Sequence, residues 1–136
     1  KDPALVKAAV KEYGDRIAVG IDAKDGMVAV DGWLEGSAVH FLDLAREMEA
    51  VGVKTVIFTD ISRDGTLTGP NLAQLRELKE NTSVQIIASG GVSGPQDIRA
   101  VRELGLYGVI CGKALYQGTL SLSEALEIAK EDKCRS

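Results

Sequence analysis

The segment VQIIASGGVSGP, residues 84–95, joins an apolar run to a glycine pair and then to a proline. The run is short and does not alternate with polar residues, which is typical of a strand buried on both faces of a parallel sheet. Pro95 suits the first turn of a helix, so the segment predicts a strand, a tight loop and a helix in that order. The segment YGVICGK, residues 107–113, repeats the strand and the glycine loop.

The rest of the chain extends this alternation. A first helix is expected to end near Tyr13. Four β-α units after it account for the remaining apolar periodicity. The expected strands are 17–21, an irregular 27–30, 56–58, 84–88 and 107–111. The expected helices are 38–51, one through Leu72 and Leu78, one from Pro95 to Leu104, and one capped by Ser121 or Ser123. Such a chain belongs to the α/β class, with helices covering a parallel sheet.

Composition limits the kind of protein. The 136 residues contain no linker-like stretch, so we expect one domain over 1–136. With 45% hydrophobic and 26% charged residues, the composition is that of a globular protein. Its net charge of −4 does not suggest the basic surface that nucleic-acid binding requires. No apolar run approaches the ~20 residues of a membrane span. Two cysteines without a C-x-x-C pair favour the cytoplasm over an oxidising compartment.

Glycine is placed where a ligand would bind. Nine of the 15 glycines lie in the stretches just after expected strands, and ligands of parallel sheets lie outside the carboxyl ends of the strands. Ser89-Gly90-Gly91 and Gly112-Lys113-Ala114 occupy this position in consecutive units. Either loop alone is explained by turn geometry, but two neighbouring loops with exposed N–H groups before helices favour a phosphate site.

Asp22 and Trp33 are the unusual residues of the first unit. Asp22 ends an apolar strand, where a carboxylate is either catalytic or paired with a cation such as Lys24. Trp33 lies in a loop flanked by glycine, and it either stacks on a planar ligand or anchors the loop. The sequence holds no Ser-His-Asp set, no cluster of metal ligands and no nucleotide-binding fingerprint.

The second unit ends in a cluster of polar residues. Thr59, Asp60 and Asp64 follow the strand at 56–58. The stretch from Asp64 through Gly65 also reads as a turn, so a purely structural role stays open for Asp64 and is favoured for Asp60. Arg63 is placed either to pair with one of these carboxylates or to contact a phosphate.

Five segments together resemble a known enzyme family. They are VGIDAKDG (19–26), VDGW (30–33), TDISRDGTLTGPN (59–71), IIASGGV (86–92) and VICGKALYQG (109–118). The sequence resembles the C-terminal half of the histidine-biosynthesis isomerases, phosphoribosylformimino-5-aminoimidazole carboxamide ribotide isomerases. A sister family, the cyclase subunit of imidazole glycerol phosphate synthase, shares several of these motifs. The segments VDGW and GKALYQG are more similar to the isomerase.

The resemblance implies a fold and a reaction. The family is a (β/α)8 TIM barrel made of two half-barrels, and this chain matches the fifth to eighth units preceded by the fourth helix. The reaction is an Amadori rearrangement, an aldose-ketose isomerisation of a small molecule with a phosphate at each end, without metal or organic cofactor. A lone half-barrel leaves sheet edges open, so we expect a complementary N-terminal half-barrel or self-association as the partner.

The resemblance also implies roles for individual residues. Asp22 matches the general acid, Thr59 a threonine that assists by hydrogen bonding, and Asp64 a supporting carboxylate. Trp33 matches a tryptophan that folds over the planar part of the substrate. The remaining residues implied in substrate and phosphate binding are Gly65, Ser89, Gly90, Gly91, Gly112 and Lys113. The general base has no counterpart in this chain, so the isolated chain is expected to be inactive. Two alternatives stay open, a cyclase and a non-catalytic phosphate-binding half-barrel.

Overall fold

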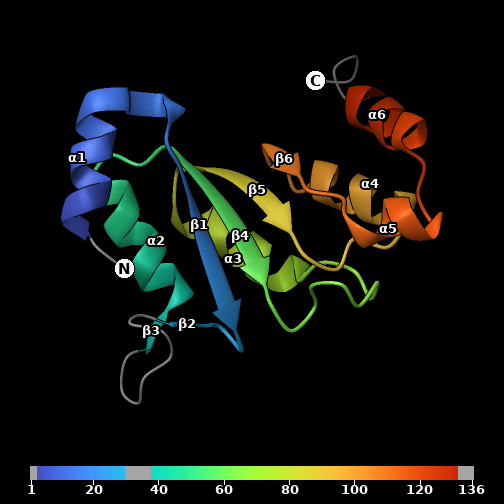
Figure 1. Ribbon diagram of the computed structural model, residues 1–136, viewed down its shortest axis with the longest axis horizontal. Helices are drawn as coiled ribbons and strands as arrows, with labels where there is room; N and C mark the ends of the chain where they lie inside the picture. The colour runs from blue at the N-terminus through green and yellow to red at the C-terminus, as the bar shows by residue number, and fades with distance from the viewer. Residues whose placement is uncertain (1–2, 30–37, 132–136) are drawn as a thin grey trace.

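The computed structural model describes residues 3–29 and 38–131 of the chain. Within them a six-stranded sheet has the strand order β3-β2-β1-β4-β5-β6 (Figure 1). Four strands are parallel neighbours, as the β-α pattern predicts: β1 (Ala18–Lys24), β4 (Thr55–Asp60), β5 (Gln85–Ser89) and β6 (Gly108–Val109). The helices are α1 (Pro3–Tyr13), the short 3-10 helix η1 (Gly14–Arg16), α2 (Phe41–Ala50), α3 (Leu72–Asn81), α4 (Pro95–Glu103), α5 (Lys113–Gln117) and α6 (Leu122–Glu131).

The sheet is mixed rather than wholly parallel. β2 (Met27–Ala29) turns back antiparallel to β1, and β3 (Ala38–His40) pairs antiparallel with β2. The helix expected from residue 38 therefore begins only at Phe41. Val39 pairs with Val28 in this ribbon, where β-branched side chains pack well. The ring of His40 then caps α2, because its Nδ1 accepts a hydrogen bond from the backbone N–H of Leu42 at 3.2 Å.

Other boundaries differ from the sequence expectation by a few residues. β1 runs on to Lys24, so Asp22 lies inside the strand rather than after it. β6 is two residues long, and the stretch after Gly112 forms the short helix α5 instead of an open loop. Of the two expected caps for the last helix, Ser121 is used: its Oγ accepts from the backbone N–H of Glu124 at 3.1 Å.

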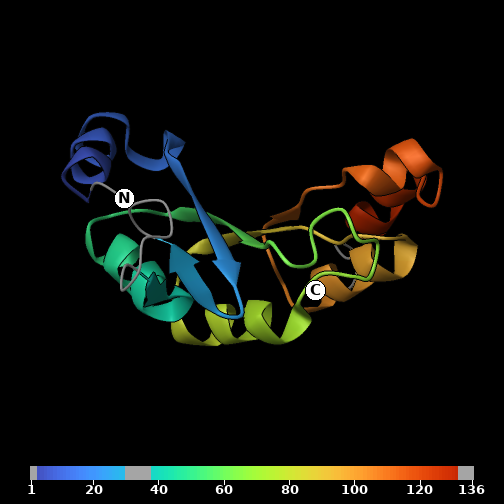
Figure 2. The same ribbon diagram turned by 60° about the horizontal axis from the view of Figure 1, so that its bottom comes forward.

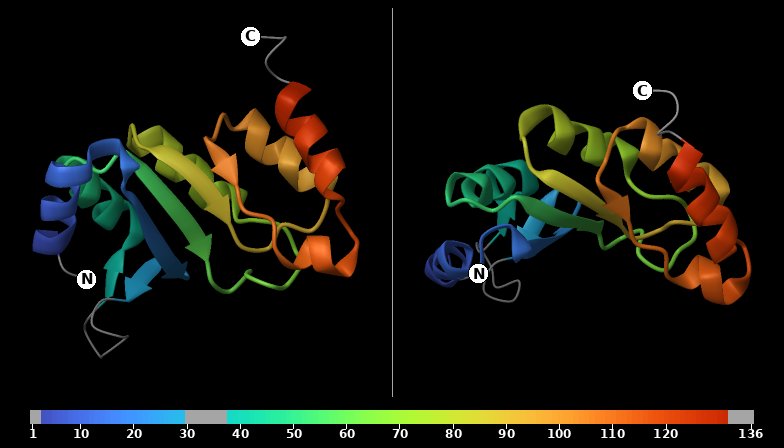
Figure 3. Two further views of the ribbon diagram at one scale, coloured as in Figure 1. Left: turned by 45° about the horizontal axis from the view of Figure 1, so that its top comes forward. Right: turned by 90° about the horizontal axis from the view of Figure 1, so that it is seen from above.

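The two faces of the sheet have different surroundings. Helices α2, α3 and α4 lie along its convex side, while α1 and α6 stand at the two ends of the arch (Figures 2 and 3). Side chains alternate along a strand, so Ile21 and Ala23 are fully buried under these helices, whereas Ala18, Gly20 and Asp22 on the other face are exposed. In the described part of the chain no helix covers this concave side.

The apolar core is divided into two clusters. The larger one fills the space between the sheet and its helices, and Phe41 and Phe58 meet in it with ring centroids 5.1 Å apart. A smaller cluster joins α4, α5 and α6 through Ile98, Ala114 and Ile128. Within the described ranges, no helix has both the length and the apolar character that crossing a membrane requires.

Candidate active site

Three polar residues form a row across neighbouring strands. In the parallel register Asp22 on β1 pairs with Thr59 on β4, and Thr59 pairs with Ser89 on β5. Paired positions of adjacent strands point to the same face, so the three side chains share the concave face near the carboxyl ends. Asp22 is exposed, Ser89 is half-buried and Thr59 is buried. The structure thus brings together the strand-end residues that the sequence singled out separately.

Asp60 anchors the loop that follows β4. Its side chain is buried on the helix side, where Oδ1 accepts hydrogen bonds from the backbone N–H and the hydroxyl of Ser62 at 3.1 and 2.6 Å. Oδ2 accepts from the amide of Asn71 at 2.8 Å. Burial by itself would raise the pKa of Asp60, but the hydrogen bonds from Asn71 and Ser62 and the nearby Arg63 charge lower it overall. The structural role favoured for Asp60 is confirmed.

The other end of the same loop is held by Arg63 and Asn71. Asn71 caps α3, because its Oδ1 accepts from the backbone N–H of Gln74 at 3.1 Å while its amide holds Asp60. Arg63 lies with its Nε 3.9 Å from the Asp60 carboxylate, and its Nη1 donates to the carbonyls of Gly69 and Pro70. Of the roles left open for Arg63, the structure therefore bears out pairing with a carboxylate.

The loop after β5 approaches this β4 loop closely. Gly90 and Gly91 have φ angles of +93° and +86°, a backbone conformation that L side chains rarely adopt. The N–H of Gly69 donates to the carbonyl of Gly91 at 2.7 Å. A Cβ on Gly91 would lie 2.5 Å from the Gly69 oxygen. Glycine is therefore required at Gly91 both by its φ angle and by the space around it.

A small cavity opens where these loops meet. Its volume is about 150 Å3, and its lining includes Gly90 and Gly91 from the first glycine loop and Gly112 and Lys113 from the second. The other lining residues are Asp64, Gly65, Leu67, Ser89, Val92 and Ile110. The two glycine loops that the sequence paired are therefore neighbours, together with the predicted residues Asp64, Gly65 and Ser89.

Asp97 fixes the far end of the first glycine loop. Its Oδ2 accepts hydrogen bonds from the backbone N–H and the hydroxyl of Ser93 at 2.7 and 2.6 Å. The carboxylate is buried and lies in the first turn of α4, where the helix dipole favours a negative charge. The sequence reasoning missed Asp97, although an aspartate two residues after Pro95 fits the enrichment of acidic residues in the first turn of a helix.

The second glycine loop is more open. Gly112 is exposed, and a Cβ there would have nothing within 4 Å. Lys113 reaches across the cavity to the β4 loop, where its Nζ donates to the carbonyl of Gly65 at 3.0 Å. Neighbouring Cys111 is half-buried against the smaller apolar cluster, and burial raises the pKa of its thiol. Lys113 thus closes one side of the cavity by bonding to the loop that carries Asp64.

Two further candidates behave differently. Trp33 lies outside the described residues, so its role stays a prediction. The suggested pairing of Asp22 with Lys24 is not formed: both side chains are exposed, and the ion pair found in the described part of the chain joins Arg63 to Asp60. Pairing with Lys24 therefore does not explain the carboxylate at position 22.

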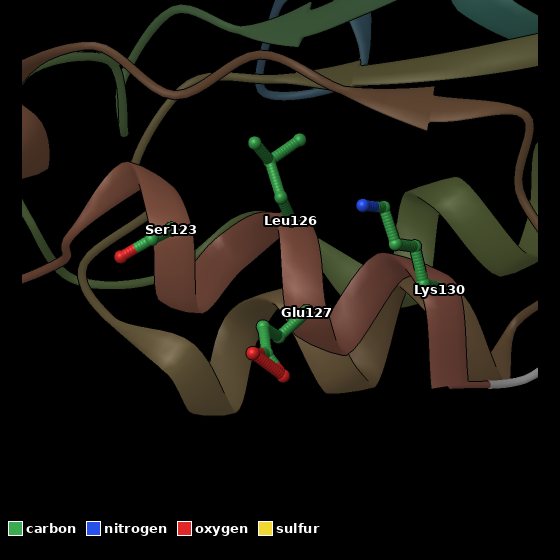
Figure 4. A pocket seen from close by; sticks show the side chains of 4 residues that line it. All are labelled: Ser123, Leu126, Glu127 and Lys130. Carbon is green, nitrogen blue, oxygen red and sulfur yellow. The ribbon is translucent and has the colours of Figure 1, made fainter.

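A second hollow, of about 550 Å3, lies on α6 away from the strand ends (Figure 4). Its lining comes from this helix alone, and Leu126 and Lys130 project from one side of it. Leu126 is half-exposed, and no polar groups from other elements converge on the hollow. It is a groove on a helix surface, whereas the cavity between the glycine loops draws residues from three β-α units.

Known proteins match the chain along most of its length. Residues 1–121 match the family described as histidine biosynthesis protein. A 1-(5-phosphoribosyl)-5-((5-phosphoribosylamino)methylideneamino)imidazole-4-carboxamide isomerase of Listeria innocua is 59% identical over 127 residues, 93% of this chain and 53% of the relative. The isomerase of the same name from Clostridium botulinum strain Langeland is 49% identical over 131 residues, 96% of this chain and 54% of the relative. The chain spans about half the length of the curated relatives it matches.

Proposed function

The chain belongs to the histidine biosynthesis protein family, and on this premise we propose that it contributes the general acid and one phosphate site of an imidazole-carboxamide ribotide isomerase. The observation that carries the proposal is the position of Asp22 in register with Thr59 and Ser89, at the edge of the sheet where the glycine-lined cavity opens. A substrate phosphate in that cavity would place the neighbouring sugar beside this row.

The proposed chemistry is an aldose-ketose rearrangement. Opening the ribose ring requires a proton on the ring oxygen, and Asp22 is the group that we assign to deliver it. Thr59, paired with Asp22 across the strands, supplies a hydrogen bond to the reacting part of the substrate. Asp64, on the rim of the cavity, supports the acid as a second carboxylate. Removal of the proton from carbon is assigned to a carboxylate outside this chain.

Phosphate binding is assigned to the two glycine loops. The positive φ angles of Gly90 and Gly91 turn successive peptide groups in a way that suits an anion, and α4 follows four residues later. Gly112 and the Lys113 ammonium form the opposite side, and Gly65 closes the rim. Binding energy from a phosphate far from the reacting carbon would hold the sugar in place during the rearrangement.

The uncovered concave face supports a further part of the proposal, namely that the catalytic unit is a closed (β/α)8 barrel. Asp22 is exposed on that face, and Ile110 beyond β6 is 45% exposed. We propose that a complementary N-terminal half-barrel covers this face and supplies the second phosphate site. The isolated chain is expected to self-associate, to bind a sugar phosphate weakly and to show no isomerisation. Scattering that finds a compact, stable monomer would count against this arrangement.

The test of the catalytic assignment is Asp22→Asn in the complete protein. Asparagine keeps the shape of the side chain but has no acidic proton to donate, so turnover should fall by about three orders of magnitude or more, with substrate binding nearly unchanged. Asp15→Asn is the matched control, since Asp15 is also exposed but precedes β1 at the opposite end of the sheet. Turnover of the Asp22 variant equal to that of the control would refute the role.

The reaction itself is tested by offering the complete protein both possible substrates. The relatives described above carry the isomerase name, which is why the isomerase is proposed rather than the ammonia-using cyclase. Conversion of the aminoaldose substrate without ammonia is the expected result. Product formation only with the cyclase substrate and ammonia would reverse the choice. As a biosynthetic enzyme with few cysteines, the protein is proposed to act in the cytoplasm.

A further inference from the structure

Arg63 occupies a position that the proposed catalytic steps do not use. Its Nη1 donates to the carbonyl of Gly69 at 3.2 Å and to that of Pro70 at 3.3 Å. The side chain thus spans six residues of the β4 loop and ties its end to its beginning. Arg63 is not among the residues that line the cavity between the glycine loops, and its guanidinium is hydrogen-bonded to backbone carbonyls of the β4 loop.

The peptide that Arg63 holds is the one on which the first glycine loop rests. Gly69 donates its N–H to the carbonyl of Gly91 at 2.7 Å. The Gly69 carbonyl, which accepts from Arg63, packs so closely against Gly91 that a Cβ there would lie 2.5 Å away. A shift of the Gly69 peptide would therefore move the Gly91 peptide with it.

Arg63 is itself held in place. Its Nε lies 3.9 Å from Oδ2 of Asp60, the same oxygen that accepts from Asn71 at 2.8 Å. At 3.9 Å this ion pair is too long to be a hydrogen bond, and the short hydrogen bonds of Asp60 go to Asn71 and Ser62. The Asp60 charge therefore orients the guanidinium without a direct hydrogen bond to it. The contacts form a continuous series from the buried Asp60 carboxylate through Arg63 and Gly69 to Gly91.

We propose that Arg63 is a positioning residue for the phosphate site: it fixes the Gly69 peptide, and through it the Gly91 loop, without touching the substrate. The inference rests on the proposed function for the identity of the bound group. Arginine suits this task because the guanidinium is planar and its N–H groups have fixed directions: Nη1 donates to both carbonyls while Nε faces Asp60. A lysine ammonium, a single point charge on a flexible stem, cannot make this set of contacts with the same geometric control.

The test uses Arg63→Ala in the complete protein, with Arg76→Ala as matched control. Arg76 is exposed on α3, so both variants lose one guanidinium but only one loses the loop contacts. Titration with inorganic phosphate should show an affinity about tenfold weaker for Arg63→Ala and unchanged for Arg76→Ala. KM for the substrate should rise by a similar factor while kcat changes by less than about threefold. Equal phosphate affinity in the two variants would overturn the proposal.

Two further measurements separate positioning from general stability. Arg63→Lys keeps the charge and should fold, and it should show an intermediate loss of phosphate affinity; affinity equal to wild type would overturn the proposal. Millimolar guanidinium ion should restore part of the phosphate affinity of Arg63→Ala, and no recovery would count against a positioning role. Phosphate titration does not need turnover. A wild-type protein that binds phosphate but does not isomerise the substrate would thus refute the proposed function and leave this inference standing.

Discussion

The two glycine loops at the carboxyl edge of the sheet read alike in the sequence but differ in the structure. Gly91, in the loop after β5, is buried against the backbone of Gly69 with a φ of +86°. Gly112, in the loop after β6, is exposed, has a φ of −120° and has free space where a Cβ would stand. One glycine is needed for packing, whereas the other leaves backbone open beside the cavity.

The difference shows how the site is built. The first glycine loop is fixed from behind by the β4 loop and by Asp97, so it is a rigid wall of the cavity. The second loop is joined to the β4 loop by the hydrogen bond from Lys113 to Gly65, which involves an exposed, long side chain. Substitutions at the two loops should therefore differ sharply in their effect on stability.

The largest effect is expected for Gly91→Ala. The added Cβ would meet a backbone oxygen at 2.5 Å in a conformation that alanine disfavours. Strain and overpacking together should lower the free energy of unfolding by about 2–5 kcal/mol. Phosphate affinity should also fall, because the first glycine loop and the β4 loop cannot both keep their positions. Urea denaturation and phosphate titration measure the two effects, and a loss below about 1 kcal/mol would contradict the close packing.

An intermediate effect is expected for Asp60→Asn, which weakens the support behind the first loop only. Losing charged hydrogen bonds from Ser62 and Asn71 should cost about 1–3 kcal/mol at pH 7. Since folding lowers the pKa of Asp60 below 3.8, its stabilisation is complete above that value and is lost as pH falls through the folded pKa. Denaturation from pH 7 to pH 3 should therefore show the stability difference between wild type and variant shrinking, and a constant difference would contradict the assignment.

The smallest effect is expected for Gly112→Ala. Neither its φ angle nor its surroundings require glycine, so the free energy of unfolding should change by less than about 0.5 kcal/mol. Gly65→Ala is the informative control, because its φ of +75° disfavours alanine although no atom lies within 4 Å of the new Cβ. That variant should lose about 1–2 kcal/mol through strain alone. If Gly112→Ala cost as much as Gly91→Ala, the contrast between the loops would be wrong.

Local patterns in the sequence located most of the elements that carry the site. The apolar runs before Gly90 and Gly112 predicted β5 and β6, and Pro95 predicted the start of α4, since these signals depend on neighbouring residues. The antiparallel ribbon of β2 and β3 was not predicted as such, because a three-residue strand such as Ala38–His40 has no periodicity of its own. Its formation depends on pairing with β2, which is a contact between distant residues.

The sequence by itself determined that Asp22, Thr59 and Ser89 lie toward the carboxyl ends of their strands, although β1 continues to Lys24, beyond the apolar run that predicted it. The tertiary structure decided their register, because pairing across strands depends on how the whole sheet assembles. It alone also decided which contacts Asp60 and Arg63 make behind the site, and that Gly91 is packed while Gly112 is open. Those properties arise from contacts between loops far apart in the chain, which no local pattern of residues records.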